Sequence, residues 1–408
     1  MHIVLVNQYY PPDTAPTGQY LHDLARVLVQ RGHRVTVLCS QRAYNGNSQY
    51  AAEEQRDGVQ IRRVRASGFG RRLGVGKLVD YASFYIFLAF RLFQPRLRPD
   101  LILALTTPPH LGLLAALAAQ WKKVPHAHWI MDIYPDVLVA HGALSATSPI
   151  YRLLAWLTRR ELRHSPLIAC LGDDMAERLR AYLPPGASSD VVKSLPLWSD
   201  PALEPWTGAE PPAFRAAQGW SDQDVVLMYS GNMGRGHRLG EFLHAASALK
   251  DQPGLHWVFA GGGKRREEVE QALAEDPGLP VRLLPYAPAE KLREHLCSAD
   301  VHLASLDTQW QGCMVPSKFQ GIFAVGRPVI FVGGPDNSLA RWIEASGGGW
   351  VVPENDPAAL LAAVAQARDP AERLRRGRSA RAFAAQHFSR ARNTQLLCEW
   401  LEAIGSVA

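Results

Sequence analysis

Residues 1–39, MHIVLVNQYYPPDTAPTGQYLHDLARVLVQRGHRVTVLC, contain the pattern that decides the fold. An apolar run at His2–Val6 predicts a buried strand, and a second run follows at Arg34–Cys39. Between them, Thr17–Gly32 carries apolar side chains at helical spacing and ends at a glycine, as many helices do. A strand, a helix and a strand in this order predict a βαβ crossover, and therefore a parallel sheet covered by helices.

The same alternation continues along the chain. Further predicted strands are Leu101–Ala104, His126–Met131, Leu167–Leu171, Val225–Tyr229, His256–Ala260, Val281–Leu284, Val301–Ala304 and Pro328–Val332. Residues 183–212 interrupt the alternation because they are rich in proline and small residues. Since 408 residues are enough for two domains, we predict one domain over 1–195 and a second over 196–387.

Composition and charge limit the classes of function. Hydrophobic residues make up 47% and charged residues 20%, an ordinary globular balance. The net charge of +6 fits an anionic partner without distinguishing nucleic acid, phosphorylated small molecules and acidic membranes. The five cysteines lack the spacing of a disulfide framework or a zinc site. The N-terminal residues lack the features of a secretory signal, so the sequence predicts a cytoplasmic protein.

Three strand-to-helix junctions in the second half combine small or cap-forming residues with a cation. They are residues 229–237 (YSGNMGRGH), 259–270 (FAGGGKRREEVE) and 314–331 (MVPSKFQGIFAVGRPVIF). A single basic loop residue is more often simply solvated, but in a doubly wound sheet all three junctions meet at the ligand-binding edge. Backbone amides with Arg or Lys bind a diphosphate, so we predict one substrate site there. Its predicted residues are Gly231, Asn232, Gly234, Arg235, His237, Gly262, Gly263, Lys264, Tyr286, Pro316, Ser317 and Lys318.

The first half offers two further candidates. Thr17 and Gly18 begin the first helix, where free amides attract phosphate, although Gly18 is equally well explained by its turn. Asp132 follows a buried strand, and its carboxylate could orient or deprotonate an acceptor hydroxyl. The alternative is that Asp132 caps the following turn. Asp136 fits a solvated residue in the first turn of a helix.

Residues 69–99, FGRRLGVGKLVDYASFYIFLAFRLFQPRLRP, have an aromatic centre flanked by cations. The cations are Arg71, Arg72, Lys77, Arg91, Arg96 and Arg98. Aromatic side chains surrounded by cations are typical of a helix that lies on an anionic bilayer, and the apolar run is too short to span one. The alternative is a crossover helix that buries the same aromatics in the first domain.

Six segments in order resemble the family-4 retaining glycosyltransferases, most closely the WbuB-like branch of O-antigen amino-sugar transferases. They are NQYYPPDTAPTGQ, RGHRVTVLC, DIYPDVLVA, YSGNMGRGH, FAGGGKRREEVE and VPSKFQGIFAVGRPVIFVGG, and they extend over nearly the whole chain. The resemblance implies an α/β protein with the GT-B fold, two facing Rossmann-like domains with a cleft between them. It also implies that the last helix, Arg390–Ile404, within residues 388–408, packs back on the first domain.

The resemblance also implies the chemistry. A UDP- or GDP-sugar, with an N-acetylated or deoxy amino sugar, is expected in the second domain as donor, with no metal or other cofactor. The expected acceptor is a polyprenyl-diphosphate-linked saccharide at the inner face of the cytoplasmic membrane, and nucleic acid is not an expected partner. Arg235 and Lys318 would stabilise the leaving phosphate, and Asp132 would orient the acceptor.

Two pairs of positions depart from the wider family. Cys313 and Gly321 stand where the family has two glutamates, the second of which holds the donor ribose. Asn232 and His237 stand where an Arg and Lys pair neutralises the diphosphate. We therefore expect Arg235, Lys264 and Lys318 to supply the missing charge.

Three other functions share these features. A nucleotide-sugar epimerase has the same architecture but needs several carboxylates near the sugar, and Asp132 is the one candidate found. A transferase could also act on a soluble acceptor. A noncatalytic, membrane-associated sugar-binding protein is the third alternative. Release of nucleoside diphosphate that depends on an acceptor distinguishes a transferase from the epimerase and from the binding protein.

Overall fold

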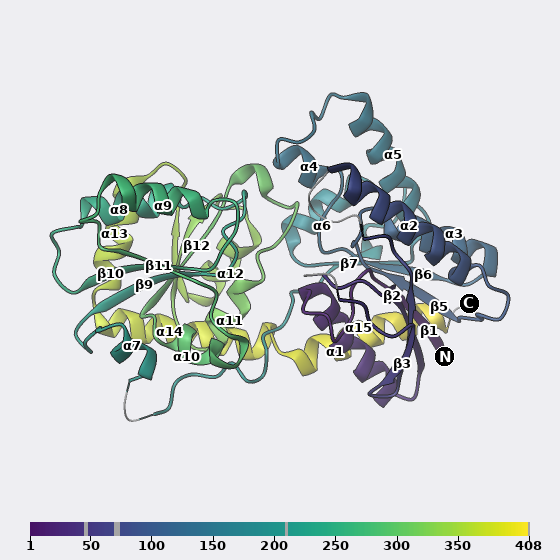
Figure 1. Ribbon diagram of the computed structural model, residues 1–408, viewed down its shortest axis with the longest axis horizontal. Coiled ribbons are helices and arrows are strands. Elements are labelled where there is room, and N and C mark those ends of the chain that lie inside the picture. Colours follow the sequence, from purple (N-terminus) through teal and green to yellow (C-terminus); the bar gives the residue numbers. More distant parts are fainter. Residues whose placement is uncertain (45–47, 69–73, 209–210, 407–408) are drawn as a thin grey trace. The chain divides into compact units, whose positions relative to one another are not determined.

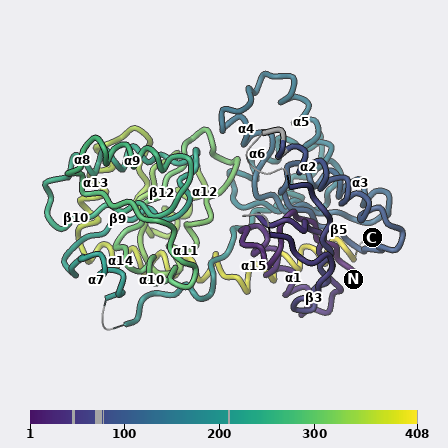
Figure 2. The backbone as a smooth tube through the Cα atoms, viewed as in Figure 1, coloured from purple at the N-terminus to yellow at the C-terminus, as the bar shows by residue number. Residues whose placement is uncertain are grey.

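The computed structural model describes residues 1–44, 48–68, 74–208 and 211–406, without the side chains of residues 74, 75 and 77 (Figures 1 and 2). The chain divides into two compact units. The first comprises Met1–Pro196 with Ala391–Ala408, and the second comprises Leu197–Arg390. The change from the first unit to the second therefore falls inside the proline-rich segment 183–212.

The first unit contains an eight-stranded sheet in the order β3-β4-β2-β1-β5-β6-β7-β8. Its strands are β1 (His2–Val6), β2 (Arg34–Ser40), β3 (Glu53–Arg56), β4 (Val59–Val64), β5 (Leu101–Ala104), β6 (His126–Trp129), β7 (Leu167–Cys170) and β8 (Val192–Ser194). Neighbouring strands are parallel except β3 and β4. All five residues of β1 are buried, as expected for a central strand covered by helices on both faces.

Helices cover this sheet. They are α1 (Pro16–Gln30), α2 (Gly74–Leu92), α3 (Leu111–Lys122), α4 (Asp136–Ala140), α5 (Pro149–Leu162), α6 (Asp173–Arg180) and α15 (Arg390–Gly405). Side chains of α2 and α3 pack with β1, β2 and β5 in one apolar core. The last helix is tied to the N-terminal segment, because Glu402 accepts hydrogen bonds from Arg31 at 2.7 and 2.6 Å and contacts His33 Nε2 at 2.7 Å.

The second unit contains a six-stranded parallel sheet in the order β11-β10-β9-β12-β13-β14. Its strands are β9 (Val225–Ser230), β10 (Leu255–Ala260), β11 (Val281–Leu284), β12 (Val301–Leu306), β13 (Val329–Gly333) and β14 (Gly349–Val352). Its helices are α7 (Ala213–Ala217), α8 (Gly240–Ala248), α9 (Arg266–Glu275), α10 (Leu292–Cys297), α11 (Lys318–Ala324), α12 (Ser338–Ser346), α13 (Pro357–Ala367) and α14 (Pro370–His387). Both units are thus α/β layers of the Rossmann type, which confirms the predicted fold class.

Every predicted strand forms, within two residues of its predicted ends. The sequence did not predict β3, β4, β8 or β14. β3 is a polar strand paired on one side, β8 has three residues with a lysine at its centre, and β14 begins with a glycine. No described helix is long and apolar enough to cross a bilayer.

Candidate active site

The second unit has its topological switch point between β9 and β12. The chain leaves β9 toward β10 and β11 on one side and returns to β12 on the other. In open parallel sheets, ligands bind beyond the carboxyl ends of the strands at such a point. The loops that follow β9 and β10, and the segment between β12 and α11, begin at this edge of the sheet.

The loops after β9 and β10 are in backbone contact. The Met233 amide donates to the Gly262 carbonyl at 2.7 Å. A Cβ at Gly261 would lie 2.1 Å from the Gly231 carbonyl oxygen, and one at Gly263 would lie 2.5 Å from the Met233 oxygen. Glycine is therefore required for this close approach. The structure brings together Gly231, Gly262 and Gly263, which the sequence analysis assigned to one site.

Lys318, the first residue of α11, reaches under the loop that follows β9. Its Nζ lies 3.5 Å from the centroid of the Tyr229 ring, and a Cβ at Gly231 would be 3.8 Å from the same nitrogen. This nitrogen is buried and has no hydrogen-bond partner among the described residues. Burial holds the pKa of Lys318 well below its usual range. A buried amine without a partner is costly, and an anion placed here would offset that cost.

His237 lies in the same loop and is a neutral side chain. Its Nδ1 is 2.6 Å from the Ser305 carbonyl oxygen, so Nδ1 donates and Nε2 is left as an acceptor. Burial, reinforced by the positive charge of Lys318, lowers the pKa of His237 to about 3. This chain therefore has an uncharged imidazole where the wider family has a cation.

The other predicted residues of the second unit lie in these loops. Arg235 and Lys264 are exposed. Tyr286 is also exposed, and its hydroxyl donates to the Gly262 carbonyl at 3.2 Å. The remaining predicted residues are Asn232, exposed, Gly234, half-buried, Pro316, buried, and Ser317, exposed at the N-cap of α11. Of the three predicted cations, Lys318 is the one held beneath the loops.

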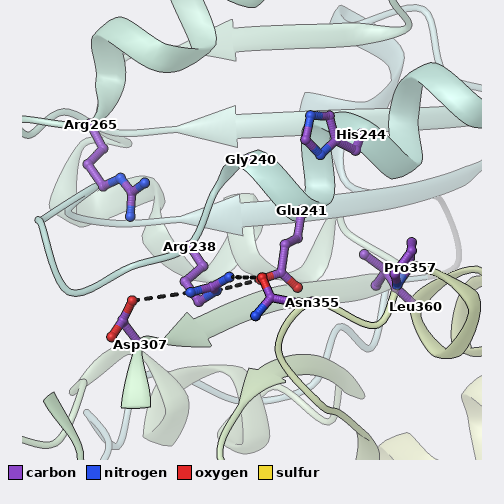
Figure 3. Close-up of a pocket in the computed structure, with 9 residues that line it drawn as sticks. All are labelled: Arg238, Gly240, Glu241, His244, Arg265, Asp307, Asn355, Pro357 and Leu360. Carbon is purple, nitrogen blue, oxygen red and sulfur yellow. Dashed lines mark hydrogen bonds and ion pairs between the residues drawn. The ribbon is translucent and has the colours of Figure 1, made fainter. Parts of the chain in front are cut away.

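A cavity of about 330 Å³ opens beside these loops (Figure 3). Its described lining residues are Arg238, Gly240, Glu241, His244, Arg265, Asp307, Asn355, Pro357 and Leu360, none of which belongs to the predicted site. Arg238 pairs with Glu241 and with Asp307, and Arg265 donates to the His237 carbonyl. Neither arginine is among the site residues predicted from the sequence. Their contacts hold the loop that carries Gly231 and His237.

Packing accounts for one of the departures from the family pattern. A Cβ at Gly321 would lie 3.2 Å from the Cδ1 atom of Leu203 and 3.5 Å from that of Leu296. A glutamate at this position would place its side chain against two leucines, where burying a carboxylate is costly. Cys313 is fully buried.

In the first unit, Asp132 follows β6 and lines a small cavity. Burial raises the pKa of Asp132 to about 6, so its carboxylate is ionised at neutral pH but titrates close to it. A pKa in this range suits a carboxylate that accepts a proton from a substrate hydroxyl or orients that hydroxyl by a hydrogen bond. The cavity of about 20 Å³ has room for about one water molecule. It is also lined by Thr106, His110, Ile130, Ile133, Tyr134, Thr158, Glu161, Leu162 and Leu179.

Glu161, on α5, is a buried carboxylate that the sequence analysis missed. Its two oxygens lie 3.6 Å from His110 Nδ1 and 3.6 Å from His128 Nδ1. Burial lowers the pKa of His128 well below its usual range, so that imidazole is neutral. In the sequence Glu161 looks like one more polar residue of an amphipathic helix. Only the packing of α5 places it beside Asp132.

Asp136 forms two hydrogen bonds that stabilise the fold of the first unit. One of its oxygens accepts a hydrogen bond from Arg178 at 2.8 Å, and the other accepts one from the Tyr182 hydroxyl. These contacts tie α4 to α6. Asp136 is thus partly buried and paired, in contrast to the solvated residue that the sequence predicted.

Thr17 and Gly18 lie in the first turn of α1. Thr17 accepts a hydrogen bond from the Asn7 side chain at 3.2 Å. A Cβ at Gly18 would be 3.0 Å from the Tyr9 carbonyl oxygen and 3.1 Å from the Tyr10 Cα. The close backbone approach gives Gly18 a packing role whether or not it also contacts a ligand.

The segment 69–99 contains both buried and exposed aromatic side chains. Phe84 in α2 is fully buried in the core, whereas Phe87 and Phe90 on the same helix are exposed. Arg71 and Arg72 lie outside the described residues, as does the side chain of Lys77.

Comparison with known proteins identifies the family. Residues 17–194 match the model of the glycosyl transferase 4-like domain, and residues 224–369 match that of glycosyl transferases group 1. The chain is 27% identical to the probable glycosyltransferase WbjE of Pseudomonas aeruginosa, over 71% of this chain and 72% of that one. It is 24% identical to the putative colanic acid biosynthesis glycosyl transferase WcaI of Escherichia coli, over 90% and 92%.

Solved structures share the fold at low sequence identity. Sucrose-phosphate synthase from Thermosynechococcus elongatus superposes with a TM-score of 0.76, at 15% identity and with full coverage of both chains. WaaG, a glycosyltransferase of lipopolysaccharide biosynthesis, gives 0.70 at 15% identity, over 97% of this chain and 99% of that one. HepE of Anabaena, solved in complex with UDP, gives 0.70 at 14% identity, over 99% and 100%. Together the two domain models and the shared architecture show that this chain is a family-4 glycosyltransferase with the GT-B fold.

Proposed function

We propose that this enzyme transfers a sugar from a UDP-sugar to a lipid-linked saccharide during assembly of a bacterial surface polysaccharide. The similarity to WcaI, named for colanic acid biosynthesis, supports the process. The complexes of HepE with UDP and with UDP-glucose support UDP as the nucleotide. An N-acetylated or deoxy amino sugar, as in the WbuB-like branch, remains our proposal for the transferred group.

The observation that carries the proposal is the buried Nζ of Lys318 at the switch point, which lies over the Tyr229 ring and has no hydrogen-bond partner in the described part of the chain. A diphosphate at this edge would give the amine the ion pair that it lacks. When the bond between the sugar C1 and the β-phosphate oxygen breaks, negative charge grows on that phosphate. Lys318 would stabilise this charge, with Arg235 and Lys264 on the loops as further cations.

The proposed reaction retains the configuration at C1. The acceptor hydroxyl forms the new glycosidic bond on the face that the leaving diphosphate vacates, and its proton passes to that diphosphate. Asp132 is assigned to the acceptor as an orienting residue, since its carboxylate is ionised at neutral pH. The acceptor places the enzyme at the inner face of the cytoplasmic membrane.

The test is incubation of the enzyme with a panel of UDP- and GDP-sugars, with and without a polyprenyl-diphosphate-linked saccharide. Release of UDP that requires the acceptor, with retained configuration by NMR, is the expected result. Interconversion of sugars without acceptor would instead identify an epimerase. Equal turnover on a soluble saccharide would refute the lipid-linked acceptor.

A further inference from the structure

Three neighbouring helices of the first unit carry most of the exposed apolar side chains. Ten of the thirteen large apolar side chains that are exposed in the described residues lie on α2, α3 and α5. They are Leu78, Val79, Ile86, Phe87, Phe90, Leu117, Trp121, Ile150, Leu153 and Trp156. α3 packs against both α2 and α5, and the three helices lie next to one another in Figure 1. Isolated exposed apolar residues are ordinary, but a group shared by adjacent elements marks an interaction surface.

The helix α2 is apolar on two opposite sides. Phe84, Leu88 and Leu92 recur every four residues and are buried against the sheet. Ile86 and Phe90 recur at the same spacing on the other side, and Phe90 is 69% exposed. The core therefore buries only one of the two apolar sides, and the outer side remains exposed and available to bind a partner.

The helices α3 and α5 extend the outer apolar side with tryptophans. Trp121 on α3 is 54% exposed and lies 5.6 Å from the Phe93 ring, just beyond α2. Trp156 on α5 is 52% exposed and has the Arg160 guanidinium 5.8 Å from its ring centroid. Indole rings with a cation alongside are well suited to the headgroup region of a bilayer, where one end of the side chain is apolar and the other is wet.

Most of the exposed charged side chains near these helices are positive, although exposed Glu53 lies 4.0 Å from Arg91 of α2. The exposed cations among the described side chains of residues 74–164 are Arg96, Arg98, Lys123, Arg152, Arg159, Arg160 and Arg163. The exposed acid in the same part of the described chain is Asp100, whose carboxylate accepts a hydrogen bond from the His2 amide at 2.6 Å. An apolar centre with a cationic surround complements an anionic lipid surface, since each cation near such a surface contributes favourably.

From these observations we infer that α2, α3 and α5 together form a docking surface for an anionic lipid bilayer. The apolar side chains enter the headgroup and upper acyl region, and the arginines contact lipid phosphates. This inference rests on the proposed function only in that a lipid-linked acceptor lies in a membrane. The surface extends beyond the segment 69–99 that the sequence indicated, because α3 and α5 contribute half of its apolar side chains.

Vesicle co-sedimentation tests the surface without any sugar transfer. The wild type should bind phosphatidylglycerol vesicles and not phosphatidylcholine vesicles at low salt. Phe90→Glu on α2 and Trp156→Glu on α5 should each weaken that binding by at least about tenfold, since each removes a large apolar side chain from the bilayer. The matched control is Leu374→Glu, which replaces a side chain on α14 that is 56% exposed, and it should bind like wild type.

Binding of UDP, measured in parallel, should be unchanged in all three variants and so report intact folding. Loss of vesicle binding with UDP binding retained supports the surface even if the proposed acceptor is wrong. The inference fails if the wild type ignores anionic vesicles or binds neutral ones equally well. It also fails if Trp156→Glu binds like wild type, or if the variants instead dissociate a wild-type dimer that does not bind vesicles.

Discussion

The substitution Lys318→Met distinguishes two effects of the buried amine. One is the destabilisation of the free enzyme, and the other is the contribution to donor binding. The Nζ of Lys318 is buried, lies over the Tyr229 ring and has no hydrogen-bond partner among the described residues. Methionine has a similar length and no charge, so it fills the same space. If the amine serves the donor, the substitution should stabilise the free enzyme and weaken donor binding at the same time.

The expected changes in stability and in UDP affinity both follow from the surroundings of the Lys318 amine. Removing a buried polar group that lacks a partner should stabilise the fold by roughly 1–3 kcal/mol. The lost contact with the Tyr229 ring offsets at most about 1–2 kcal/mol of this gain, and less if the depressed pKa of Lys318 leaves the amine uncharged. A charge-assisted hydrogen bond is worth roughly 1.5–3 kcal/mol, so UDP affinity should fall about tenfold to 150-fold.

Thermal unfolding in the absence of ligand gives the stability, and titration calorimetry with UDP gives the affinity. Lys250→Met, at an exposed position just after α8, is the matched control and should change neither quantity. A variant that lost stability and kept its UDP affinity would refute the reasoning, because Lys318 would then be a packing residue. Unchanged values of both would refute it equally.

The same calorimetric titration also measures whether Lys318 takes up a proton when UDP binds. Burial lowers the pKa of Lys318 in the free enzyme, and a bound diphosphate would raise it again. At a pH at which the Lys318 amine of the free enzyme is uncharged, the wild type should therefore take up protons as UDP binds, which is detected by repeating the titration in buffers of different ionisation enthalpy. Lys318→Met should show no such uptake from this site.

Two further predictions concern the first unit. The pKa of Asp132 is raised from 3.8 to about 6, so folding favours its protonated form, and the stability associated with that form is lost as pH rises from about 4 through 6. Asp132→Asn should remove this part of the pH dependence of the unfolding free energy. It should also remove the fall in the rate of sugar transfer below about pH 6 that protonation of Asp132 causes. If that fall persists in the variant, another group is responsible for it. Gly18→Ala should destabilise the fold by roughly 1–3 kcal/mol, because its Cβ would meet the backbone of Tyr9 at 3.0 Å, and denaturant unfolding with the wild-type midpoint would contradict this.

Much of the fold can be predicted from the sequence, because the strands of a parallel sheet are buried on both faces. Continuous apolar runs such as Val225–Tyr229 need no knowledge of their neighbours to be recognised. The same local order placed Gly231 and Gly263 just after strands and Lys318 at the start of α11, the α-helix that follows β12, and parallel strands end at one edge. That these residues meet at one site was therefore predictable. That β4 pairs with β2 was not, since its pattern is interrupted by Arg62 and Arg63.

The tertiary structure alone decided which charges are satisfied. Arg235, Lys264 and Lys318 are equivalent cations in the sequence, yet Lys318 is the one whose nitrogen is buried with no hydrogen bond to any described residue. His237 becomes a neutral acceptor because a carbonyl from β12 accepts its Nδ1 proton. Burial and hydrogen bonding depend on residues that are remote in the chain, so no local pattern contains them.

The same distinction applies to the helix faces. The sequence predicted an aromatic helix in residues 69–99 and left open whether it packs in the core or on a membrane. Packing gives one side, with Phe84, to the core and leaves the other, with Phe90, exposed. Periodicity determines that a helix has apolar sides, but how many of them the protein itself covers depends on which elements pack there. That α3 and α5 continue the exposed side was therefore decided only when the three helices came together.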